Sequence, residues 1–122
     1  MARTISVAKT LVGVDATTKY TLYTIPPKQT GLWKVQYIIS LTGNETPEVY
    51  WYDHSNNTEY FVVGGKNLGT GDYILLDGDA VVALQENDQI RIKNSGTTYA
   101  VTYIATIDLV FADAVQFHGN GA

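Results

Sequence analysis

The sequence predicts an all-β protein: a single antiparallel β-sandwich of jelly-roll or immunoglobulin-like type. The composition favours strands, because Tyr occurs nine times against three Phe and two Trp, with many Thr and Val. Apolar and polar residues alternate with a period of two in several stretches, which is the pattern of half-buried strands. Turn residues recur about every eight to twelve residues, the spacing of a sandwich of short strands. No window keeps a helical period.

The strand predicted at the centre of the fold follows Pro26 and Pro27. Neither proline can donate to a ladder, so the preceding strand must end there. Residues 32–41 alternate strictly, which divides their side chains between two faces. One face carries only large apolar or aromatic residues, and we expect it to be the core: Trp33, Val35, Tyr37, Ile39 and Leu41. In this interpretation Val35→Asp would bury an unpaired charge and prevent folding.

The remaining strands follow from the same alternation and from the turns between them. We expect them, in chain order, over residues 4–12, 19–25, 48–53, 58–63, 73–76, 80–84, 89–93 and 98–110. The last is the longest, and its predicted core face carries Tyr99, Val101, Tyr103, Ala105, Ile107 and Leu109. The chain then divides into an N-terminal arm or edge strand (1–12), a β-sandwich domain (13–111) and a C-terminal tail (112–122). The alternation does not predict the order of the strands.

Length and charge exclude several classes of function. A chain of 122 residues makes one domain with a single core. Its formal net charge of −4 makes it a poor candidate for binding DNA or RNA. The absence of Cys excludes disulfides, thiolate catalysis and Cys-ligated zinc. No run has the length of a membrane-spanning helix, and residues 1–10 do not resemble a signal peptide. We therefore expect a cytoplasmic protein, or part of a particle assembled in the cytoplasm.

Titratable side chains gather at two places that could hold a metal. His54 lies beside Asp53, with Glu59 across a predicted hairpin. A tight site needs three or four converging ligands, so a solvated turn is the favoured interpretation. The second group is acidic and lies in loops: Asp72, Asp77, Asp79, Glu86 and Asp88. It lacks the spacing of a calcium loop, and turn chemistry explains its Asp-Gly pairs.

Enzymatic motifs are missing from the sequence. The glycine-rich stretch 64–71 lacks the Gly-Lys-Ser/Thr ending of a phosphate-binding loop. No Ser lies in a nucleophile elbow, and neither His has a context for acid–base catalysis. We therefore predict no catalytic residues, no cofactor and no metal site, and we do not expect an enzyme.

The predicted hairpin over 48–63 is the most promising binding surface. If Trp51 faces the core, Tyr50 and Tyr52 face outward, and Tyr60 is expected to join them. Exposed Tyr with few charges is typical of protein interfaces. The alternative is that two packed sheets bury both faces partly, with each hydroxyl reaching solvent. The two ends of the chain add apolar residues that could cross to a neighbour: Ile5, Val7, Val115 and Phe117.

Two motifs carry a resemblance to a known group of proteins. The first is Tyr23-Thr24-Ile25-Pro26, followed by a polar turn and a long strand. The second runs from Leu84 to Ile92 (LQENDQIRI). Over about residues 20–110 the chain resembles small β-sandwich virion proteins of tailed bacteriophages, among them capsid decoration (cement) proteins, head fibres, and tail or neck components. It departs from their pattern at the doubled proline and at Asn87, where the pattern prefers Gly.

The resemblance implies a role and partners. It implies a decoration protein on the outside of the capsid, assembled in the host cytoplasm, that binds the major capsid protein or other virion subunits. It further implies a homo-oligomer that contacts neither nucleic acid nor membrane. One alternative is a neck, tail or fibre component of the same particle. A second alternative is a carbohydrate-binding β-sandwich, in which exposed Tyr and Trp would stack on sugar rings.

Overall fold

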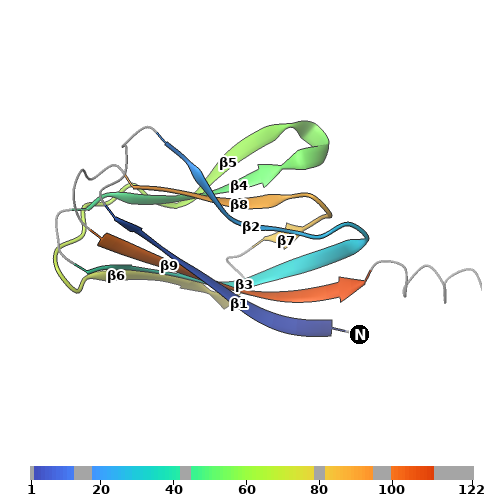
Figure 1. Ribbon diagram of the computed structural model, residues 1–122, viewed down its shortest axis with the longest axis horizontal. Coiled ribbons are helices and arrows are strands. Elements are labelled where there is room, and N and C mark those ends of the chain that lie inside the picture. Colours follow the sequence, from blue (N-terminus) through green and yellow to red (C-terminus); the bar gives the residue numbers. More distant parts are fainter. Residues whose placement is uncertain (1, 13–17, 42–44, 79–81, 95–99, 112–122) are drawn as a thin grey trace, which may run out of the picture.

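The computed structural model describes residues 2–12, 18–41, 45–78, 82–94 and 100–111, which form two antiparallel sheets packed face to face (Figure 1). The expected all-β sandwich is therefore confirmed. The strands are β1 (Ala2–Val12), β2 (Tyr20–Thr24), β3 (Gln29–Ser40), β4 (Pro47–Asp53), β5 (Thr58–Gly64), β6 (Tyr73–Asp77), β7 (Ala83–Leu84), β8 (Gln89–Asn94) and β9 (Ala100–Phe111). A 3₁₀ turn, His54–Asn56, joins β4 to β5. Among the described residues no helix could cross a membrane.

The strand order, which alternation did not predict, divides the chain into two layers. The first sheet has the order β1-β9-β3-β6, and β7 also pairs with β3. The second sheet has the order β2-β8-β4-β5. Figure 1 shows the first sheet below and the second above. The long strands β3 and β9 lie beside each other at the centre of the first sheet, and each spans 12 residues.

The core fills the space between the two sheets. On β9 the predicted face is the buried one, because Val101, Tyr103, Ala105 and Ile107 have no exposed surface and Leu109 is 1% exposed. Tyr99 lies outside the described residues. The buried apolar residues from the rest of the chain are Leu11, Ile25, Trp33, Ile38, Val49, Leu68, Leu84, Ile90 and Ile92.

A β-bulge in β3 overturns most of the predicted core face, leaving only Trp33 of its five residues buried. Trp33 lies opposite Ile107, but the next pairing is Val35 opposite Thr106, so one extra residue is inserted between them. An extra residue shifts the alternation by one and sends every later side chain to the other face. Trp33 is buried as expected. The expectation that Val35, Tyr37 and Ile39 belong to the core is wrong. They are half-buried and lie on the outer face.

The buried positions after the bulge are taken by residues that the sequence had placed outside. Ile38 has no exposed surface, and the polar side chains of Gln36 and Ser40 are buried with it. Leu41, expected in the core, is 46% exposed. Around β3 and β6 the first sheet therefore presents apolar side chains on its outer surface, while part of its inner surface is polar.

The turn that precedes β8 is joined to the end of β4 and to the turn after it, at one end of the second sheet. The carboxylate of Asp88 is 1% exposed. It accepts hydrogen bonds from the Trp51 indole at 3.2 Å, the His54 backbone N–H at 3.0 Å and the Gln85 backbone N–H at 2.9 Å. Asn87, just before it, has φ 68°. Asn tolerates this left-handed conformation better than most residues, which explains why it can replace the Gly of the virion-protein pattern.

The N-terminal segment forms the edge strand of the first sheet. Residues 2–12 pair with β9 in one unbroken register from Ala2 opposite Val110 to Val12 opposite Ala100. Thr4, Ser6 and Thr10 each form a side-chain hydrogen bond to β9 as well. Residues 2–12 are therefore held to their own sheet along their whole length.

Candidate interaction surfaces

The outer face of the second sheet carries aromatic rings covered by cations. Tyr50 and Tyr52 of β4 point outward, as expected, and β8 lies beside them. The Lys19 amine lies 4.1 Å from the centre of the Tyr50 ring, and the Arg91 guanidinium lies 3.9 Å from that of Tyr52. Both are cation–π contacts. Glu59 of β5 pairs with both cations.

These contacts change the acidity of two groups on this face. Burial, together with a hydrogen bond to Glu48 and the negative charges of Glu48 and Glu59, raises the pKa of Tyr50 to about 12. Burial alone would raise the pKa of Glu59, but the hydrogen bonds from Lys19 and Arg91 outweigh it and hold that pKa below its usual value. The Tyr50 phenol is therefore neutral and the Glu59 carboxylate ionised over the physiological range.

Tyr60 does not join the other two tyrosines. It lies opposite Trp51 in the hairpin register and stacks on it, with ring centres 4.9 Å apart. The pairing runs without a shift from Asp53 opposite Thr58 to Tyr50 opposite Phe61, which places Tyr60 on the same side as Trp51. Phe61 takes the outward position instead. It is 55% exposed and meets the Tyr50 ring edge-on at 5.7 Å.

Of the candidates near the chain ends, Ile5 and Val7 do not lie on the outer face of the second sheet. Ile5 and Val7 lie on β1 in the first sheet, where they are half-buried and pack against the core. Val115 and Phe117 lie outside the described residues. The structure thus assembles Tyr50 and Tyr52 on one surface and separates them from Tyr60, Ile5 and Val7.

The outer face of the first sheet carries an apolar patch that the sequence reasoning missed. Tyr73 is 60% and Leu75 51% exposed on β6. The register places Leu75 opposite Tyr37 and Tyr73 opposite Ile39, and Ile104 of β9 flanks Tyr37 on the other side. We call this set, with Val35 and Leu41, the apolar patch. Its β3 members were hidden from sequence analysis because unbroken alternation placed them in the core.

The rings of the apolar patch differ in one respect from those of the second sheet. The centres of the Tyr37 and Tyr73 rings lie 5.7 Å apart, so these rings contact each other. The cation–π contacts found among the described residues, by contrast, both lie on the second sheet. Contact of a partner with the apolar patch would therefore remove exposed apolar side chains such as Tyr73 and Leu75 from water without displacing a cation from a ring of the described residues.

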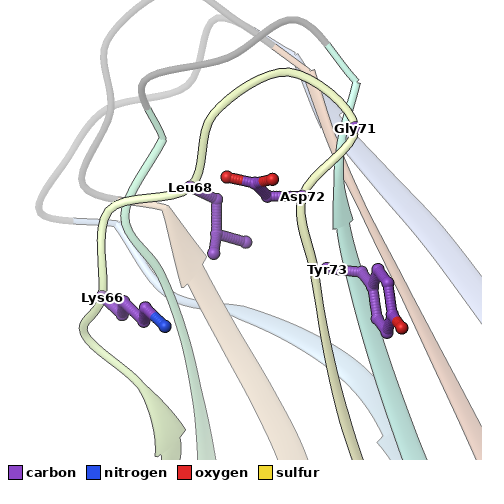
Figure 2. Close-up of a pocket in the computed structure, with 5 residues that line it drawn as sticks. All are labelled: Lys66, Leu68, Gly71, Asp72 and Tyr73. Atoms are coloured by element: carbon purple, nitrogen blue, oxygen red, sulfur yellow. The ribbon is translucent and has the colours of Figure 1, made fainter.

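A small hollow adjoins the apolar patch where the loop before β6 meets Tyr73 (Figure 2). It is lined by Lys66, Leu68, Gly71, Asp72 and Tyr73. Figure 2 shows the Asp72 carboxylate turned toward the loop, where it accepts a hydrogen bond from the Gly69 backbone N–H at 2.9 Å. The carboxylate thus shapes the loop, and the hollow gives the end of the patch a polar border.

The residues considered as metal ligands take part in turns. The Asp53 carboxylate accepts hydrogen bonds from Ser55 and Asn56, and the bond from Asn56 is the main reason that its pKa is lowered. The Asp88 carboxylate accepts a hydrogen bond from the Gln85 backbone N–H in the turn before β8. Asp79 and His118 lie outside the described residues. Within the described part of the chain, no group of three or more His, Asp or Glu residues could hold a metal ion.

Neither a protein-family model nor any curated protein sequence matches the chain. Solved structures do resemble it. A chain from the capsid structure of Helicobacter pylori bacteriophage KHP30 aligns with a TM-score of 0.59 at 10% identity, over 90% of this chain and 94% of that one. A chain from the capsid asymmetric unit of cyanophage Pam1 aligns with a TM-score of 0.53 at 16% identity, over 88% and 84%.

Two further likenesses come from other kinds of assembly. A chain of infectious bursal disease virus, Gx strain, gives a TM-score of 0.61 at 12% identity, but the match spans only 31% of that longer chain. A chain from Bacillus endospore appendages, described as disulfide-linked pili, gives 0.55 at 15% identity over 86% of its length. At these identities the likeness establishes the fold alone. It is a β-sandwich that also occurs in capsid and appendage chains.

Proposed function

We propose that the chain is a structural protein of a virus particle, namely a capsid decoration (cement) protein that binds the outside of the major capsid shell and stabilises it. The observation that carries the proposal is the likeness to the KHP30 capsid chain, which spans nearly all of both chains. A sandwich of this size therefore occurs as a whole chain within a phage capsid. The motif resemblance to small virion proteins of tailed phages supports the same class.

The contact with the shell is assigned to the apolar patch. Exposed aromatic and aliphatic side chains in one cluster are typical of protein interfaces, and Tyr73 and Leu75 are more than half exposed. Tyr50 and Tyr52 serve as a secondary surface, because cations already cover their rings. A standard interface buries roughly 800 Å² per partner, and repetition on a symmetric shell strengthens weaker contacts by avidity.

The test is binding of purified protein to particles that lack it, with one variant on each face. Leu75→Glu places a charge in the apolar patch, and Phe61→Glu places one on the second sheet at a position of similar exposure, 55% against 51%. We expect Leu75→Glu to weaken binding at least tenfold, about 1.4 kcal/mol, and Phe61→Glu to bind nearly as well as the wild type. The reverse result would move the contact to the second sheet.

Copy number separates this role from a neck, tail or fibre position. A protein that cements the shell should be present in hundreds of copies per particle, whereas a ring or spike would contribute about six or twelve, according to the symmetry of its site. Quantitative mass spectrometry of particles gives this number. Failure of the wild-type protein to bind any particle would refute the virion role. We propose no enzymatic activity for this fold.

A further inference from the structure

The four edges of the two sheets are protected to different degrees. A free strand edge can pair with another chain, and proteins usually prevent this with short strands, bulges, charges, Pro or Gly. β2 has five residues with an irregular register, and β5 carries a bulge and ends at Gly64. β6 has five residues and β7 only two. Each of these edges offers too little regular backbone for extended pairing.

The remaining edge, β1, lacks all of these protections except charge. It has 11 residues without Pro or Gly, and its register with β9 is continuous. Among the described residues, the side of β1 that faces away from β9 pairs with no other strand. Most of its side chains are exposed, including Ser6 and Ala8. Its charges, Arg3 and Lys9, decide which partner it can accept.

We propose that β1 is a dimerisation strand, which pairs antiparallel with β1 of a second copy across a two-fold axis at Val7. The two first sheets then join into one continuous sheet through a self-complementary contact, the form expected of a two-fold dimer. The proposal adds a specific partner and register to the role suggested above, but does not depend on that role.

The sequence of β1 selects this register. In an antiparallel pair, facing residues lie on the same side of the sheet, so odd positions must face odd positions and even must face even. With Val7 facing Val7 of the second copy, the whole strand pairs with its copy, and Thr4 faces Thr10, a favourable cross-strand pair. Lys9 then faces Ile5. Shifting the axis to Ser6 would instead oppose Arg3 and Lys9, two like charges.

The two-fold axis stands perpendicular to the joined sheet and leaves both apolar patches on the same side. At about 4.8 Å per strand, their centres lie roughly 30 Å apart. Two coplanar patches could bind two sites on one surface, so the second contact would form at a high effective concentration. This consequence alone rests on the proposed function. The dimer itself can be tested without particles.

The first experiment uses single-cysteine variants of the full chain, which has no Cys of its own. Facing positions in a pair have Cα atoms about 4.5–5.5 Å apart, within disulfide range. Val7→Cys should therefore form a disulfide dimer with oxidised glutathione. Thr4→Cys is the control, because its two copies would lie about 20 Å apart along the strand. A failure of Val7→Cys to cross-link, or equal cross-linking of both variants, would overturn the proposal.

The second experiment measures mass by sedimentation equilibrium for two double variants. Ser6 faces Ala8 of the second copy in this register, and both positions are exposed, so circular dichroism should show native folding for each. Ser6→Glu with Ala8→Glu opposes four carboxylates and should give a monomer. Ser6→Lys with Ala8→Glu opposes unlike charges and should restore the dimer, with a dissociation constant at least tenfold lower than that of the variant with two Glu residues. A monomeric wild type, or a dimer indifferent to both changes, would show that β1 is not the contact.

Discussion

Replacing Asp88 by Ala should remove roughly 3–4 kcal/mol of stability. The buried carboxylate accepts hydrogen bonds from the Trp51 indole and from the backbone N–H groups of His54 and Gln85. A buried donor left without a partner costs about 1–3 kcal/mol. His54 and Gln85 have exposed side chains, so water can reach part of the space that the carboxylate leaves. The summed cost of the three unpaired donors therefore stays below its upper limit. The loss is a large part of the free energy of unfolding of a typical domain, which is roughly 5–15 kcal/mol.

The measurement is urea unfolding followed by circular dichroism, with the free energy taken from the linear extrapolation. Glu86→Ala is the matched control in the same turn, because Glu86 is exposed and accepts the Lys28 backbone N–H at 3.2 Å. It should change the free energy of unfolding by less than about 1 kcal/mol. A double-mutant cycle with Trp51→Phe isolates the indole bond, since the phenyl ring has no donor to leave unpaired.

If the free energy of unfolding of Asp88→Ala lay within about 1 kcal/mol of the wild-type value, this reasoning would be refuted. It would mean that the three donors find water or other partners without cost, and that Asp88 does not stabilise the junction of the turn before β8 with the end of β4. A loss equal to that of Glu86→Ala would have the same meaning.

Other expected outcomes follow from single contacts. Val35→Lys should fold and melt cooperatively, because Val35 lies on the outer face opposite Asp77, whereas Ile38→Lys should prevent folding by burying a charge. The advantage of wild type over Glu59→Gln should be present above about pH 4.5 and disappear in more acid solution, since the cations beside Glu59 lower its folded pKa; a constant difference in melting temperature across that range would contradict this. Asn87→Val should cost about 1–2 kcal/mol at φ 68° and Asn87→Gly under about 1, as measured by urea unfolding. EDTA should leave the melting temperature unchanged, and a large drop would indicate a bound metal.

The strands and turns could be predicted because their signals are local. In β9 the alternation continues without a bulge, so the face predicted from residues such as Tyr103 and Ile107 is the buried one. Asn87, where the virion-protein pattern prefers Gly, has φ 68° in the structure. The outward placement of Tyr50 and Tyr52 also followed from period-two alternation once Trp51 was placed inside.

Other features depend on neighbours that are distant in the sequence. The bulge after Trp33 appears only in the pairing of β3 with β9, and the phase of Tyr60 appears only in the pairing of β5 with β4. The role of Asp88 could not be read from an acidic loop, because its donors come from Trp51 and His54 on another strand and turn.

The sequence by itself determined the class of fold, the approximate strands and the polar turns, since backbone preference and alternation act within a few residues. Tertiary structure alone decided which face of β3 is buried, because one inserted residue exchanges the two faces of everything after it. It also decided that Tyr37, Tyr73 and Leu75 form one exposed patch and that, within the described part of the chain, β1 is a long edge strand paired on one side only. Both depend on which strands pair, and strand pairing is a property of the whole sheet.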